Sequence, residues 1–103
     1  DFQHNNLEEL PERAFADLGN LRKLYLNENS LTSLPGDCFS GAYSLQHLYL
    51  DWNRLQRLPE GIFGGMSKLK TLLLYENSLQ ALSDGVFDDL AALETLRLDR
   101  NEL

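Results

Sequence analysis

The chain repeats itself every 24 residues, and this repeat constrains its fold more than any other feature of the sequence. Three leucine columns hold Leu21, Leu45, Leu69 and Leu93, then Leu24, Leu48, Leu72 and Leu96, then Leu26, Leu50, Leu74 and Leu98. An asparagine column holds Asn5, Asn29, Asn53, Asn77 and Asn101. Each unit has the form L-x-x-L-x-L-x-x-N-x-L-x-x-L-P-x-x-x-F, with Ser83 in place of one proline. So many columns in register, without an insertion, identify a tandem repeat.

The leucines spaced two apart predict a short β-strand in each unit, because strand side chains alternate between two faces. The proline further along excludes a helix at that point. Parallel strands stacked ~4.8 Å apart form a curved sheet. We therefore predict an α/β repeat solenoid with a curved parallel β-sheet on the concave face and irregular or 3₁₀ segments on the convex face.

We expect residues 1–103 to form a single domain of about five units. Their ranges are 1–20 (partial), 21–44, 45–68, 69–92 and 93–103 (partial), with a first partial strand at Asp1 and Phe2. A solenoid needs polar caps over its end leucines, and no cap is recognisable in this sequence. Exposed ends would allow copies to stack end to end.

Other columns have their own structural roles. The asparagine amide can donate and accept where the strand turns away and its backbone loses ladder partners. One phenylalanine per unit predicts a stacked spine of Phe15, Phe39, Phe63 and Phe87. Cys38 shares a column with Ala14, Ile62 and Val86, which favours a buried thiol; a reactive or intermolecular thiol is the alternative.

Composition excludes several classes of function. The net charge of −7 argues against nucleic acid, which needs a basic stripe, and favours a cationic or polar partner. No apolar run could span a membrane, and Asp1 to His4 do not begin a signal peptide. His4 and His47 are too far apart to share a metal, and Glu28 with Asp51 are too few ligands for calcium. With no catalytic triad or phosphate loop in the pattern, we expect no cofactor, no metal site and no enzymatic activity.

The 24-residue unit resembles the "typical" leucine-rich repeats of extracellular proteins, among them Toll-like receptors, Slit proteins and the Nogo receptor. It is most similar to the variable lymphocyte receptors of jawless vertebrates, through Leu31-Thr32-Ser33-Leu34-Pro35-Gly36 and Gly85-Val86-Phe87-Asp88. The resemblance implies a leucine-rich-repeat horseshoe. It also implies a secreted protein or the ectodomain of a cell-surface receptor, and recognition of antigens or pathogens on the concave surface.

The third, fifth, seventh and eighth positions of each unit are predicted to face solvent on the concave side. They hold three of the four tyrosines and the only tryptophan, residue types that dominate binding hot spots. Carboxylates in successive units border these aromatic residues. The residues that we predict to bind a ligand are Tyr25, Glu28, Tyr49, Asp51, Trp52, Tyr75, Glu76, Arg97 and Asp99.

We therefore expect a non-catalytic recognition module, of an immune type, that binds a protein or a microbial cell-surface ligand with positive charge. The alternative is an adhesion, guidance or matrix scaffold with a host protein as its partner. Both hypotheses use the same surface.

Overall fold

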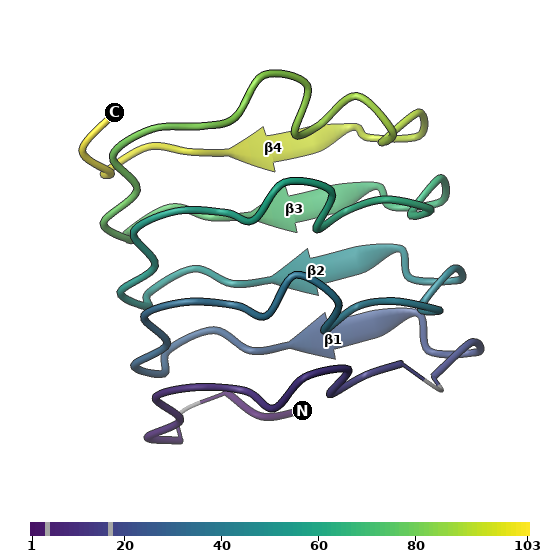
Figure 1. Cartoon of the computed structure of the whole chain (residues 1–103), viewed down its shortest axis with the longest axis horizontal. Coiled ribbons are helices and arrows are strands. Elements are labelled where there is room, and N and C mark those ends of the chain that lie inside the picture. The colour runs from purple at the N-terminus through teal and green to yellow at the C-terminus, as the bar shows by residue number, and fades with distance from the viewer. Residues whose placement is uncertain (4, 17) are drawn as a thin grey trace.

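The computed structural model describes residues 1–3, 5–16 and 18–103. It contains four short strands, β1 (Lys23–Tyr25), β2 (His47–Tyr49), β3 (Thr71–Leu73) and β4 (Thr95–Arg97). They form one parallel sheet in chain order, and each residue pairs with the one 24 positions later, as Leu24 does with Leu48. In Figure 1 the strands lie one above another, each followed by a loop that returns to the next. The predicted parallel-sheet solenoid is confirmed.

At the beginning of the chain, one expectation is untested and another is wrong. His4, an eighth-position residue expected to face the concave side, and Asp17 lie outside the described residues. Residues 1–3 are not a strand, so the partial strand predicted at Asp1 and Phe2 is not formed. The Phe2 N–H still donates to the Tyr25 carbonyl at 2.8 Å, which places Phe2 in the column of Leu26.

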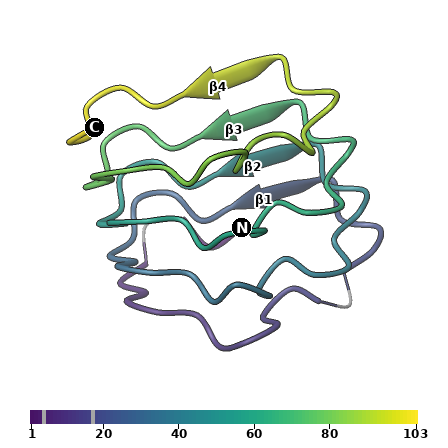
Figure 2. The ribbon, with the colours of Figure 1, turned by 45° about the horizontal axis from the view of Figure 1, so that its top comes forward.

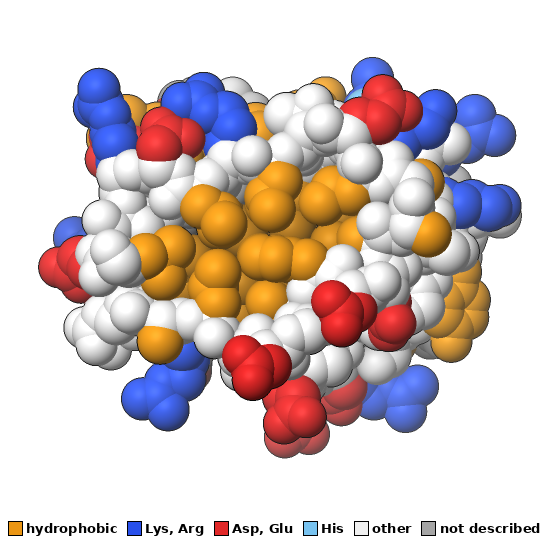
Figure 3. Space-filling view, turned by 90° about the horizontal axis from the view of Figure 1, so that it is seen from above, with side chains coloured by type: hydrophobic (Ala, Val, Ile, Leu, Met, Phe, Trp, Pro, Cys, Tyr) orange, Lys and Arg blue, Asp and Glu red, His pale blue; other side chains and the backbone are white. Residues whose placement is uncertain are grey.

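The returning segments lie behind the sheet (Figure 2). The leucine columns pack together in the core between them and the sheet. Leu48 and Leu72, in the central strands, are fully buried, whereas Leu96 in β4 is only half-buried. Burying a leucine contributes about 1.5–3 kcal/mol, so these columns are the main stabilising element. Figure 3, seen from the β4 end, shows apolar side chains gathered in the middle of that end and ringed by polar ones.

The segments that return behind the sheet consist of turns, and no helix occurs in the described ranges. In the second unit the Cys38 N–H donates to the Pro35 carbonyl at 3.2 Å, and the Ser40 N–H donates to the Asp37 carbonyl at 3.1 Å. Hydrogen bonds over three residues are of the 3₁₀ type. The convex side is therefore irregular, as expected.

The asparagine column forms a hydrogen-bond ladder. Asn53 Nδ2 donates to the carbonyls of Leu26 and Leu50, both at 3.0 Å, and its Oδ1 accepts from the Leu31 N–H at 3.0 Å. Asn77 repeats the same pattern one unit later. Each buried amide thus links two units at the turn after the strand, where main-chain groups need new partners.

Phenylalanine rings stack beneath the convex side. The ring centroids of Phe15 and Phe39 lie 6.0 Å apart, and those of Phe63 and Phe87 lie 6.1 Å apart. Cys38 beside them is fully buried, as predicted. Burial raises the pKa of the Cys38 thiol to about 12, so the thiol is un-ionised at neutral pH.

Candidate functional site

One surface of the molecule presents the positions between the inward leucines. We call it the sheet face and define it as positions three, five, seven and eight of each unit. In β1, Lys23 is exposed, Leu24 is buried and Tyr25 is half-buried, as strand alternation requires. The same alternation holds in β2 and β3, where the middle residue of each strand is buried between two half-buried neighbours. The described sheet-face residues therefore lie together on one side of the sheet. Among them, Asp51 is buried.

Aromatic rings cover the part of this face that belongs to β1 and β2. The rings of Tyr25 and Tyr49 stack with centroids 4.7 Å apart and planes only 8° apart. His47 lies nearly parallel to Tyr49, with 6.4 Å between centroids. Trp52, the only tryptophan in the chain, is 50% exposed. Tyr25, Tyr49 and Trp52 are thus three accessible aromatic residues on one face, and we call them the aromatic patch.

Asp51 corrects one expectation, because it was predicted as an accessible carboxylate and is only 4% exposed. The short side chain lies in the column between those of Asn27 and Tyr75, in a central unit of the solenoid. Burial raises the pKa of Asp51; a hydrogen bond from the Tyr75 hydroxyl opposes that rise, and the negative charge of Glu28 adds to it. Oδ1 of this carboxylate has no hydrogen-bond partner.

Two further carboxylates of the sheet face, those of Asp99 and Glu76, form ion pairs that were not predicted from the sequence. Asp99 makes a two-pronged ion pair with Arg97, with Nε–Oδ1 and Nη2–Oδ2 distances of 3.0 Å and 2.7 Å. This pair lowers the pKa of Asp99. Glu76 accepts a hydrogen bond from Arg100 Nη1 at 2.9 Å.

The face is therefore mixed in charge rather than uniformly acidic. Arg97 also lies over the Tyr75 ring, with its central carbon 4.2 Å from the ring centroid, a cation–π geometry. Arg97 and Arg100 offset the carboxylates nearest to them, those of Asp99 and Glu76.

The eighth position of each described unit has a left-handed backbone. Glu28, Trp52, Glu76 and Arg100 have φ values between 57° and 59°, a region that ordinarily costs a residue with a Cβ roughly 1–2 kcal/mol. A main-chain bond holds each conformation where the next unit is present, as when the Trp52 N–H donates to the Tyr75 carbonyl at 3.1 Å. These side chains consequently form one row along the edge of the sheet face.

The repeat pattern and this geometry agree with known proteins. The family model for the leucine-rich repeat matches the chain twice, over residues 1–55 and 44–103. The chain belongs to the leucine-rich-repeat family. A comparison with curated protein sequences finds no match.

Two solved structures share the fold of this leucine-rich-repeat chain. It is similar to a chain of the Drosophila Toll–Spatzle complex, with 35% identity over 95% of its length and a TM-score of 0.89. It is also similar to a leucine-rich-repeat protein of Leptospira interrogans, with 35% identity over 94% of its length and a TM-score of 0.83. The chain spans only 13% of the first protein chain and 24% of the second.

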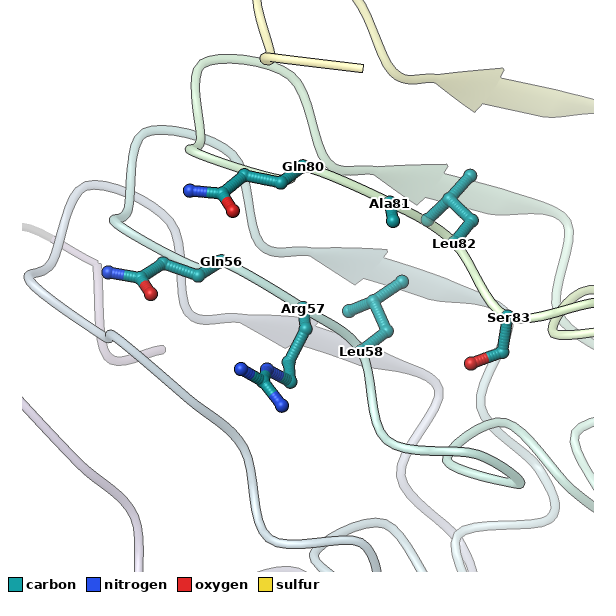
Figure 4. A pocket seen from close by; sticks show the side chains of 7 residues that line it. All are labelled: Gln56, Arg57, Leu58, Gln80, Ala81, Leu82 and Ser83. Atoms are coloured by element: carbon teal, nitrogen blue, oxygen red, sulfur yellow. The ribbon is translucent and has the colours of Figure 1, made fainter.

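Other features of the leucine-rich-repeat chain offer less chemistry. A shallow hollow of about 310 Å³ lies between the returning segments of two units (Figure 4). Ala81 lies one unit after Arg57, and Ser83 replaces the proline found at Pro59, so small side chains border this hollow. Within the described residues, no three His, Cys, Asp or Glu side chains gather as a metal site requires. The same part of the chain contains no helix long and apolar enough to cross a membrane.

One ion pair of the sheet face was readable from the repeat, although it was not among the predictions. Arg100 follows Glu76 by 24 positions, so these two residues occupy one column in adjacent units and their pairing was readable from the repeat. The unpartnered polar atoms of Asn27 and His47 have no comparable signal, because they depend on side-chain conformation.

Proposed function

We propose that this leucine-rich-repeat chain is a non-catalytic recognition module that binds a protein partner through its sheet face. The observation that carries this proposal is the aromatic patch, in which the rings of Tyr25 and Tyr49 stack and Trp52, on the same face, is half exposed. The interior is already filled by leucines, so no packing need explains these rings on the outside. Tryptophan and tyrosine dominate binding hot spots, and repeat solenoids use extended sheet surfaces for binding.

The proposal extends to an extracellular, immune-type receptor. It is supported by the similarity to a chain of the Toll–Spatzle complex, a complex described as a molecular hub in Drosophila development and innate immunity. It is also supported by the likeness of 31–36 and 85–88 to phrases of variable lymphocyte receptors. The ligand would then be an antigen or a component of a microbial surface.

The second candidate is a cell-adhesion, guidance or matrix scaffold that binds a host protein through the same face. The two candidates differ in the source of the ligand and not in the residues that contact it. Binding of the labelled protein to microbial cells, compared with host membranes at equal protein content, separates them.

Alanine variants of matched exposure test the sheet face. Trp52→Ala should weaken binding about 30-fold, because a truncated hot-spot residue costs about 2 kcal/mol or more. Tyr43→Ala is the control, because Tyr43 is 61% exposed but lies on the turns outside the sheet, against Gly65. Circular dichroism should show both variants folded.

Three further results bear on the proposal. Equal binding by Trp52→Ala and by the unaltered chain would overturn it, as would equal losses in both variants. Added salt should weaken binding where carboxylates of the sheet face meet a cationic ligand. Sedimentation of the protein alone tests end-to-end stacking through the half-buried leucines of the end units, such as Leu7 and Leu93. A single monomeric species would exclude stacking.

A further inference from the structure

A hollow at the edge of the sheet face is bordered by a carboxylate and an indole from adjacent units. Glu28, Asn29 and Trp52 line it, and its volume is about 450 Å³. Glu28 and Trp52 are both exposed, so a partner can reach them. The Asn29 amide is used within the chain, since it accepts from the Leu7 N–H at 3.2 Å and donates to the Leu26 carbonyl at 3.1 Å. A ligand in the hollow would therefore meet chiefly the Glu28 carboxylate and the Trp52 ring.

The main chain holds these two residues in matching positions. Glu28 and Trp52 have φ values of 59° and 57°, and the N–H of each donates to a carbonyl of the next unit. The acceptor for Glu28 is the Asp51 carbonyl at 3.0 Å, which belongs to the peptide group that leads into Trp52. The carboxylate and the ring thus border one hollow on a main chain that is already ordered, and this lowers the cost of binding.

The same column of the repeat contains a carboxylate that is bound by an arginine. Glu76 lies two units after Glu28, and Arg100 in the next unit donates from Nη1 to Glu76 Oε1 at 2.9 Å. In the unit after Glu28, the corresponding residue is Trp52, which supplies an aromatic ring and no positive charge. A guanidinium from a partner can therefore take the place beside Glu28 that Arg100 has beside Glu76.

A second contact on this face shows how a guanidinium combines a ring with a carboxylate. The central carbon of Arg97 lies 4.2 Å from the Tyr75 ring centroid, while Nε and Nη2 donate to Asp99. A guanidinium can do both because it is planar and its donors form a fork that matches a carboxylate. Tryptophan attracts cations to its ring face more strongly than tyrosine does. Trp52 and Glu28 together offer the same two kinds of contact.

We propose that the hollow of Glu28 and Trp52 binds an arginine side chain of a protein partner, with the guanidinium against the Trp52 ring and paired with the Glu28 carboxylate. This inference rests on the proposed function, since it names the group that enters the same face. The net charge of −7 favours the approach of a positive partner. A lysine fits less well, because its compact ammonium neither stacks on a ring nor forks to a carboxylate.

Fluorescence of Trp52, the only tryptophan, provides the measurement. The unaltered chain is titrated at constant ionic strength with the peptide acetyl-Gly-Arg-Gly-amide and, separately, with peptides that carry citrulline or lysine in place of the arginine. Citrulline keeps the planar shape of the side chain and removes its charge. We expect roughly fivefold weaker half-saturation with the citrulline peptide, since it loses both the ion pair and the cation–π contact, and a smaller loss with the lysine peptide.

Two results of this titration would contradict the inference. Equal half-saturation by the arginine and citrulline peptides, or no response to any of the three, would overturn it. Equal half-saturation by the lysine and arginine peptides would overturn the assignment to arginine. This arm of the test uses the unaltered chain, so it does not depend on the folding of a variant.

Two carboxamide variants complete the test. Glu28→Gln should abolish the preference for arginine over citrulline, because it keeps the length of the side chain and removes its charge. Glu60→Gln is the control and should leave the preference unchanged, since Glu60 is exposed on the turns behind the sheet and not on the sheet face. Circular dichroism should show both variants folded. A preference that survives Glu28→Gln, or that disappears in Glu60→Gln, would overturn the inference.

Binding of Trp52→Ala to microbial cells and host membranes tests the proposed function separately. If Trp52→Ala weakens that binding while the arginine and citrulline peptides bind alike, this inference fails and the proposed function stands. If Trp52→Ala binds as the unaltered chain does, both fail.

Discussion

Replacing Asn53 with alanine should lower the free energy of unfolding by roughly 2–6 kcal/mol. Asn53 is 8% exposed. Its Oδ1 accepts from the Leu31 N–H at 3.0 Å, and its Nδ2 donates to the Leu26 and Leu50 carbonyls at the same distance. Both carbonyls also accept a bond from the asparagine of a neighbouring unit, so alanine leaves them one partner each. The Leu31 N–H loses its asparagine partner altogether.

The magnitude follows from these partners. A buried donor left without an acceptor costs about 1–3 kcal/mol, and each of the two lost hydrogen bonds to a carbonyl costs about 0.5–1.5 kcal/mol. A chain of this length has a total stability of about 5–15 kcal/mol. Asn53→Ala should therefore fold but unfold at a markedly lower denaturant concentration.

Urea unfolding followed by circular dichroism measures the loss. Asn5→Ala is the control, since Asn5 is exposed and its Nδ2 bonds only near carbonyls, those of Phe2 at 2.9 Å and Gln3 at 3.4 Å. Its cost should be about 1 kcal/mol or less. Equal losses in the two variants would refute the view that the buried amides stabilise the stack.

Two further predictions concern the turns and the buried thiol. Gly41→Ala would put a Cβ 2.3 Å from the Ala16 carbonyl oxygen at a φ of 88°, whereas Gly61→Ala meets no atom within 4 Å at a φ of 76°. Gly41→Ala should therefore cost well over the roughly 1–2 kcal/mol expected for Gly61→Ala, and equal losses in urea unfolding would contradict the close approach. The Cys38 pKa is about 12 in the folded chain against an ordinary 9.0, so the associated stability is complete below pH 9.0 and is lost as pH rises toward 12. The free energy of unfolding should fall from pH 8 to pH 10, less so in Cys38→Ala; an identical fall would assign it to other groups.

The interior of the fold was predictable because each unit contacts the next at a constant sequence distance. Leu48 and Leu72 pair in the sheet as their columns predict, and Cys38 is buried with its column. In a solenoid the long-range contacts repeat the local ones, so periodicity contains the register. The partial strand predicted at Asp1 and Phe2 was wrong, because among the described residues only one main-chain hydrogen bond, from the Phe2 N–H to the Tyr25 carbonyl, joins residues 1–3 to the unit of β1.

The position of the sheet face was predictable from the sequence, but the exposure and ion pairing of its side chains were not. Alternation placed Tyr25 and Asp51 outside the leucine interior, but it gave no account of their accessibility. Asp51 is buried in its column beside the larger Tyr75, and Asp99 is paired with Arg97 because both side chains can adopt conformations that meet. Such outcomes depend on rotamers and on neighbouring side chains, and the repeat pattern of the sequence does not encode either.

The amino-acid sequence by itself determined the repeat, the parallel register, the leucine interior and the asparagine ladder, because all of these follow from one period of 24 residues. The tertiary structure alone decided which charges of the sheet face are offset and which oxygens stay unpaired. It also decided that Glu28 and Trp52 adopt a left-handed backbone at the edge of that face. The physical reason is that hydrophobic burial follows a side chain's position in the repeat, whereas charge pairing and hydrogen bonding depend on distances of about 3 Å between side-chain atoms.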